Sequence, residues 1–215
     1  MLKKIILAFL INLICSPIFS QEYESSSSSG SENKVDFLLS GGYSQIVIAG
    51  NSYQGYNGSA KLLFPLSSSF SFGVGGKYEY ATSTSGALDN PNGAINSTFN
   101  AIYAGLDFAY KLSFSFVDFQ LNPYGYYGVY NYWNRDTTFS GTTISGNPNV
   151  TTNLLYGLGF SVLFKLGMFY FGPSAIYSRG YMECDSYKDT FGNSFSANTG
   201  NYEIYNYNFT IGMFL

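Results

Sequence analysis

The chain has 215 residues, of which 20% are aromatic and only 11% are charged, with a formal net charge of −3 and no histidine. Soluble domains carry about 25% charged residues, so this composition departs from theirs. The slight acidity argues against a nucleic-acid partner, which needs basic patches, and the lack of histidine argues against transition-metal sites.

The first 20 residues have the pattern of a secretory signal peptide. Two lysines precede an almost wholly apolar run at 5–14, which is too short to cross a bilayer as a helix. We expect cleavage between Ser20 and Gln21. The alternative is a lipoprotein acylated on Cys15, although the residues before it lack the small side chain usually found ahead of such a cysteine.

Residues 21–34 contain a serine run and are predicted to form a disordered spacer. The remaining residues, 35–215, are predicted to form one domain of eight strands, most of them longer than the five or six residues usual in globular sheets. The predicted strands are 35–49, 55–66, 69–82, 99–112, 117–133, 152–165, 168–183 and 201–214.

The connections between these strands alternate in length. Short turns are expected near 67–68, 113–116 and 166–167, whereas the polar stretches 83–98, 134–151 and 185–200 are expected to be long loops. Only the connection near 50–54 breaks the alternation by being short. Short turns at one end and longer loops at the other are typical of transmembrane barrels, with both termini on the short-turn side.

The last strand shows the alternation of side chains most clearly. Tyr205, Tyr207 and Phe209 begin an apolar file that runs to the final residue, while Asn206 and Asn208 begin a file of small or polar groups. A period of two places the two files on opposite faces of a strand. The second file is too polar for a dry core, so the pattern predicts one face toward lipid and one toward a polar lumen.

The whole chain therefore favours an all-β fold, a closed antiparallel eight-stranded transmembrane β-barrel with short periplasmic turns and longer extracellular loops. No stretch after residue 20 is apolar for the roughly 18 residues of a spanning helix, and bilayers admit only helices and closed barrels. Aromatic residues near strand ends are expected to form interfacial girdles. They are Phe169, Phe171, Tyr177, Tyr202 and Tyr205.

Ionisable residues on the inward files form the candidate site. A charge at membrane depth is costly unless it is paired or hydrated, and such residues often mark functional paths. Because side chains about fill an eight-stranded lumen, we expect a paired plug that replaces a hydrophobic core, and keep a gated conduction path as the alternative. The residues are Lys61, Lys77, Glu79, Asp107 and Asp118, of which the first four are expected to share one network.

With its signal peptide, alternating strands and aromatic terminal strand, the chain resembles the small eight-stranded bacterial outer-membrane barrels. These include the OmpA-transmembrane-domain, OmpX-like and OmpW-like proteins and a generic outer-membrane β-barrel family common in Bacteroidetes. The resemblance implies the bacterial outer membrane as location, its lipid and its assembly machinery as partners, and a monomer. It also implies an assembly signal at the C-terminus, with Leu215 in the last place where phenylalanine is usual; the residues are Phe209, Ile211, Met213, Phe214 and Leu215.

The chemistry of the chain favours a role without catalysis, cofactor or metal. Barrel enzymes of this size class rely on a histidine beside serine or aspartate, which is missing here. Surface display, with loops that contact an unidentified extracellular ligand, is the first functional hypothesis. A narrow porin-like or OmpW-like barrel that passes ions or small solutes is the second. A secreted lipocalin-like barrel is a weaker third, since it needs the opposite facing of apolar residues.

Overall fold

The computed structural model describes residues 34–48, 50–85, 94–139 and 142–215. The predicted signal peptide with its cleavage site, the alternative acylation site at Cys15 and nearly all of the predicted spacer lie outside these residues. No helix in the described part of the chain is long and apolar enough to span a membrane.

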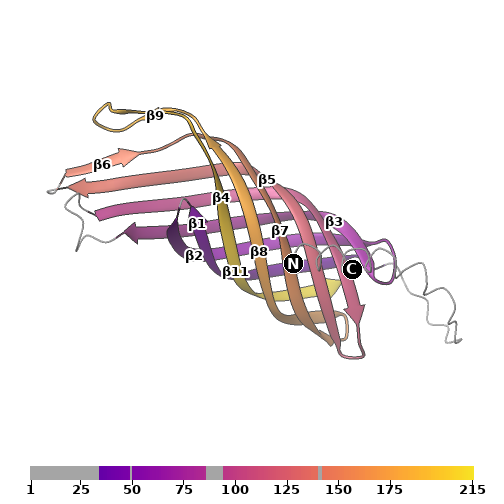
Figure 1. Cartoon of the computed structure of the whole chain (residues 1–215). Coiled ribbons are helices and arrows are strands. Elements are labelled where there is room, and N and C mark those ends of the chain that lie inside the picture. Colours follow the sequence, from indigo (N-terminus) through magenta and orange to yellow (C-terminus); the bar gives the residue numbers. More distant parts are fainter. Residues whose placement is uncertain (1–33, 49, 86–93, 140–141) are drawn as a thin grey trace, which may run out of the picture. The chain divides into compact units, whose positions relative to one another are not determined.

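Eight long antiparallel strands close into a barrel (Figure 1). Their order around the wall is β4-β3-β2-β1-β11-β8-β7-β5, and pairing of β5 with β4 closes the ring. The predicted fold class is therefore confirmed. The strands are β1 (Asp36–Ile48), β2 (Asn51–Pro65), β3 (Phe70–Ser85), β4 (Ala94–Ser113), β5 (Val117–Phe139), β7 (Val150–Leu166), β8 (Phe169–Cys184) and β11 (Asn198–Phe214).

The first strand of the barrel pairs along its whole length with the last strand. Their ladder runs from Asp36 opposite Phe214 to Ile48 opposite Tyr202. Inside the barrel, the hydroxyl groups of Ser40 and Thr210 share a hydrogen bond of 2.8 Å across this ladder. The ring is thus closed by residues 170 positions apart in the sequence.

The wall separates an apolar outside from a polar inside. On β7, Leu154, Leu158 and Phe160 are between 44% and 48% exposed, whereas Asn153 and Ser161 on the opposite face are buried. Aromatic and aliphatic side chains are exposed in the same way on the other strands of the ring. A surface this rich in exposed apolar groups suits contact with hydrocarbon and not with water.

At one end of the barrel the strands are joined by tight turns. The connections between β2 and β3, between β4 and β5, and between β7 and β8 span only 66–69, 114–116 and 167–168. Gly167, with a φ of 64°, makes the last of them possible. These are the three predicted short turns. The end of the β1–β11 ladder at which Asp36 pairs with Phe214 lies on the same side.

The other end differs from the prediction, because much of the expected loop sequence is strand. β3, β4 and β5 continue into the polar stretches, and β5 pairs beyond the barrel with β6 (Thr142–Gly146). The short strands β9 (Tyr187–Lys188) and β10 (Ser194–Phe195) form a hairpin at this end, visible beside β6 in Figure 1. These extensions project beyond the lipid, so neither of their faces needs to be apolar. Polar residues therefore form ladders there without the apolar alternation that predicted the strands.

Strand β5 keeps its facing by means of a bulge. The β4–β5 register shifts between Ile102 and Tyr103, where Tyr130 and Gly128 are the successive partners, so Val129 is an extra residue. Val129 and Tyr130 are both exposed, and Asn131 and Trp133 return to the inner file. Without the bulge Tyr130 would point into the lumen.

A proline inside β5 is compensated by its neighbour. Pro123 has no N–H, and the β4–β5 ladder omits the pairs opposite Phe108 and Ala109. The side-chain amide of Asn122 donates to the Phe108 carbonyl at 3.3 Å. One side chain thus supplies a donor where the backbone has none.

Candidate functional site

The lumen, where the sequence places the candidate residues, contains a polar middle between two apolar layers. Toward the extended ends of the strands lies a cluster that includes Ile46, Phe99, Leu155 and Met182. Toward the tight turns lies a smaller cluster that includes Leu38 and Leu163. The charged residues predicted to face inward lie between or beside these layers, and all of them are buried.

Lys61 and Asp107 form the first ion pair of the polar middle. Lys61 on β2 lies 2.6 Å from the Asp107 carboxylate on β4, across the intervening strand β3. The Tyr126 hydroxyl of β5 donates to the other Asp107 oxygen. Both oxygens of a fully buried carboxylate therefore have partners, as burial of a charge requires.

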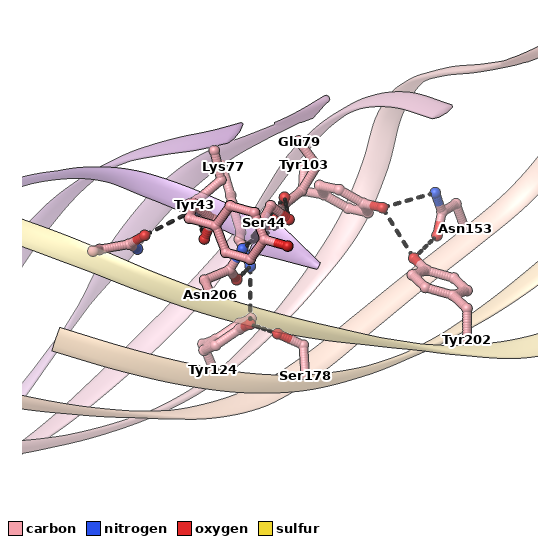
Figure 2. Close-up of polar contacts among 12 residues, drawn as sticks. Tyr43, Ser44, Lys77, Glu79, Tyr103, Tyr124, Asn153, Ser178, Tyr202 and Asn206 are labelled. Carbon is pink, nitrogen blue, oxygen red and sulfur yellow. Dashed lines mark hydrogen bonds and ion pairs between the residues drawn. The ribbon is translucent and has the colours of Figure 1, made fainter. Parts of the chain in front are cut away.

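Lys77 and Glu79 form the second ion pair, on the inner face of β3 (Figure 2). The Lys77 Nζ lies 2.8 Å from Glu79 Oε1 and donates to Asn206 Oδ1 at 2.7 Å. Glu79 accepts hydrogen bonds from the Ser44 hydroxyl at 2.6 Å and from the Asn206 amide at 3.0 Å. Three strands (β1, β3 and β11) are joined by these contacts across the centre of the barrel.

The ring of Tyr124 lies between the two ion pairs. The Lys61 and Lys77 ammonium groups are 5.4 and 5.7 Å from its centroid, within the range of a cation–π interaction. Its hydroxyl bonds to Ser178 of β8, and its ring packs on that of Tyr126 at 4.7 Å. The four residues expected to share a network thus form two pairs, which touch through tyrosines that the sequence analysis did not select as site residues.

Asp118 lies apart from this group, near the tight turns. Its partner is Lys165 of β7, at 2.7 Å. Close to the same end, Lys111 pairs with Asp36 at 2.7 Å and lies over the ring of Phe214 at 5.3 Å. The sequence analysis did not select Lys111, Lys165 or Asp36. Each lies an even number of residues from inward-facing residues of its own strand, and that spacing could have identified it.

A neutral polar layer lies on the other side of the ion pairs. The Tyr103 and Tyr202 hydroxyls are 3.0 Å apart, Asn153 donates to Tyr103 at 3.2 Å, and Tyr202 donates to Asn153. Figure 2 shows these three side chains meeting beside the charged group. The expectation that Tyr202 belongs to an interfacial girdle is wrong, because it shares the inner file of β11 with Asn206 and is 1% exposed.

Glycines on the inner files make room for the buried tyrosine rings. A Cβ added to Gly180 would overlap the Tyr202 ring, and one added to Gly157 would lie 2.6 Å from the Tyr124 hydroxyl. A Cβ at Gly75 would overlap the Asp107 carboxylate. Real Cβ contacts are not this close, so the glycines determine where the polar side chains of the plug fit.

The arrangement is a closed plug of balanced charge. A cavity among the hydroxyl groups beside Lys61 and Asn122 measures only about 20 Å³, which is enough for a water molecule and too small for a solute. No group of three or more His, Cys, Asp or Glu that could hold a metal is present in the part of the chain that the structure describes. Each of the four ion pairs described above joins a lysine to a carboxylate within 2.8 Å, so the charged groups of the plug neutralise one another.

The predicted assembly signal occupies both faces of the last strand. Phe209, Ile211 and Leu215 are at least half exposed on the outside, as their file predicts. Met213 is half-buried, and Phe214 packs on the inner face against the Tyr170 ring at 5.1 Å. Recognition of this strand by assembly machinery stays a prediction.

No protein-family model and no curated protein matches the sequence. Solved barrels are similar in fold: Neisserial surface protein A is 12% identical, with a TM-score of 0.46 and with 87% of this chain and 100% of that one covered. A major outer membrane protein from Thermus thermophilus is 14% identical (TM-score 0.45; 84% and 99% covered). The outer membrane protein AlkL, solved in lipid bilayers, is 11% identical (TM-score 0.44; 91% and 97% covered). At such values the fold assignment rests on the strand order and register described above.

Proposed function

We propose that this chain is a non-enzymatic barrel of the bacterial outer membrane, whose plugged lumen provides stability and whose extended strand ends contact the surroundings. The observation that carries the proposal is the inside-out facing of the wall. Leu158 and Phe160 are about half exposed while Lys77 and Glu79 are buried. That facing suits a lipid environment and is the reverse of a soluble lipocalin-like barrel.

The filled lumen supports display in preference to transport. Three successive layers of side chains cross the barrel, and the charged groups of the middle layer are paired with one another. The extended end, in contrast, presents ladders and a hairpin beyond the barrel wall. The partners that follow are membrane lipid, the assembly machinery and an extracellular ligand, and the unit is a monomer.

Two experiments test the proposal. In planar bilayers, refolded protein is expected to give no steady ion current, and steady channels would favour the narrow-pore alternative. In intact cells, a cysteine at Ser194 in β10 should react with a membrane-impermeant maleimide, whereas one at Ser68 in a tight turn should not, both in a Cys184→Ser background. Equal labelling of both positions, or recovery of the protein in the soluble fraction, would contradict the proposed location.

A further inference from the structure

The extended end of the barrel contains a cavity of about 430 Å³. It is lined by Trp133 and Met182 from the inner files of β5 and β8, and by Pro148, Tyr187 and Phe195 from the segments beyond the barrel. Pockets that hold small organic molecules measure about 300–1,000 Å³. This mouth cavity is thus large enough for a ligand, unlike the space deeper in the lumen.

The mouth cavity is closed toward the lumen. Met182 belongs to the apolar cluster that also contains Phe99 and Tyr202, and Trp133 packs against that cluster. Beneath them the hydrogen bonds among Tyr103, Tyr202 and Asn153 cross the barrel. A molecule that enters from outside therefore meets a floor, which makes the cavity a site of binding and not a section of a channel.

The lining has the chemistry of a site for a neutral ring. Three aromatic side chains face the cavity, and two of them, Tyr187 and Phe195, stack at 4.9 Å with an interplanar angle of 11°. The Trp133 indole N–H already donates to Ser97 at 3.3 Å, which leaves the ring as apolar surface. Asp185 is the one charged side chain in this lining, and it already accepts a hydrogen bond from Asn149 at 3.0 Å, so nothing there favours an anion.

One side of the cavity offers hydrogen-bonding groups. Residues 198–201 of β11 line it and pair with β8, but among the described residues the ladder from β11 to β1 stops at Ile48 opposite Tyr202. The edge of β11 that would face β1 therefore lies beside the cavity with its backbone amides and carbonyls directed away from β8. A ligand with a polar group on one side can bond to this edge while its ring contacts the aromatic wall.

We propose that the mouth cavity binds a small, uncharged aromatic molecule that carries a hydroxyl or amide group. The inference rests on the proposed function only in placing this end of the barrel outside the cell. It assigns a ligand class to an end of the barrel for which the fold alone indicates none.

The chain provides its own reporter for this proposal. Trp133 is the single tryptophan of the sequence, so its fluorescence in the full refolded protein in detergent micelles reports on the cavity. Naphthalen-2-ol, the probe, is expected to change this fluorescence saturably. Gly200→Phe should weaken the response at least about tenfold by filling the space, since a Cβ at Gly200 meets nothing within 4 Å. Phe191→Ala, on the same hairpin but outside the lining, should leave it unchanged.

Further arms decide the ligand class. Naphthalene-2-sulfonate and a naphthylmethylammonium ion should bind at least about tenfold more weakly than the neutral probe, because the cavity offers a charge no free partner. The neutral probe should also slow alkylation of Cys184, which lines the cavity. A non-saturable response that is equal in Gly200→Phe would show partition into micelles and overturn the proposal, as would equal binding of the sulfonate. None of these outcomes depends on conductance or on location in cells, so the proposed function is tested separately.

Discussion

Replacing Glu79 by alanine should destabilise the barrel by about 3–5 kcal/mol, the usual cost of removing one partner of a buried ion pair. Lys77 is 3% exposed and would keep only Asn206 at 2.7 Å and the Tyr124 hydroxyl at 3.5 Å. The change also removes the acceptor of the Ser44 hydroxyl, and each orphaned buried donor costs about 1–3 kcal/mol. The upper half of the range is therefore expected.

The pair should matter less when both members are replaced together. The double variant Lys77→Met with Glu79→Gln keeps the volume, leaves no unpaired charge and retains an amide oxygen as acceptor, so it should lose less than Glu79→Ala alone. Lys188→Ala, at an exposed position of β9, is the surface control and should stay within about 0.5 kcal/mol of the parent. Urea unfolding in lipid vesicles, followed by tryptophan fluorescence, measures all three.

Two results would refute this reasoning. If the double variant loses as much as the single one, the cost does not come from an unpaired charge. If Glu79→Ala is nearly neutral in stability but opens a steady current in planar bilayers, the ion pairs act as a gate. The transport hypothesis would then replace the plug.

Other predictions address the lipid-facing wall, the glycines beside buried tyrosine rings and the β9–β10 hairpin. Leu158→Arg should cost about 2–4 kcal/mol near the bilayer midplane, whereas Ser194→Arg should be tolerated, and equal unfolding midpoints would show that the facing is wrong. Gly180→Ala should cost about 1–3 kcal/mol by displacing a buried tyrosine ring, while Gly125→Ala, with open space around it, should be close to neutral in the same unfolding assay. Asp189 accepts hydrogen bonds from the Asn193 side chain and from backbone amides of the hairpin turn. These hydrogen bonds, that of the Asn193 side chain first, hold the pKa of Asp189 below its ordinary value. NMR titration should show this, and the support that Asp189 gives the hairpin should persist above the ordinary pKa and be lost as pH falls through the lowered one.

The alternation of side chains was enough to predict the barrel and the facing of its strands. Inward residues such as Asp107 and Gln120 are buried, and outward ones such as Phe209 are exposed. The same rule failed where a strand projects beyond the lipid. The extension of β5 as far as Phe139, for example, has no apolar face to detect. The rule also could not locate the bulge at Val129, because an extra residue in one strand is visible only from the pairing with its neighbour.

The contacts within the lumen were less accessible from sequence. A period of two gives the face of a residue but not its height in the barrel, which depends on the stagger between strands. Asp118 and Asp107 share an inward facing, yet one pairs with Lys165 near the turns and the other with Lys61 in the middle. Tyr124 and Tyr126 share the inner file of β5 with Asp118, but only the register shows that they contact the ion pairs.

The ladder between the first and last strands makes the barrel intolerant of truncation. Until β11 is in place, β1 can pair with β2 but has no partner on its other edge. A premature stop codon before residue 198 would leave the sheet with two open edges, one on β1 and one on β8, and open edges cannot be accommodated in hydrocarbon. The product would be an aggregation-prone open sheet and not a smaller barrel. Nonsense mutations at any codon before residue 198 should therefore be equivalent to complete loss of the protein.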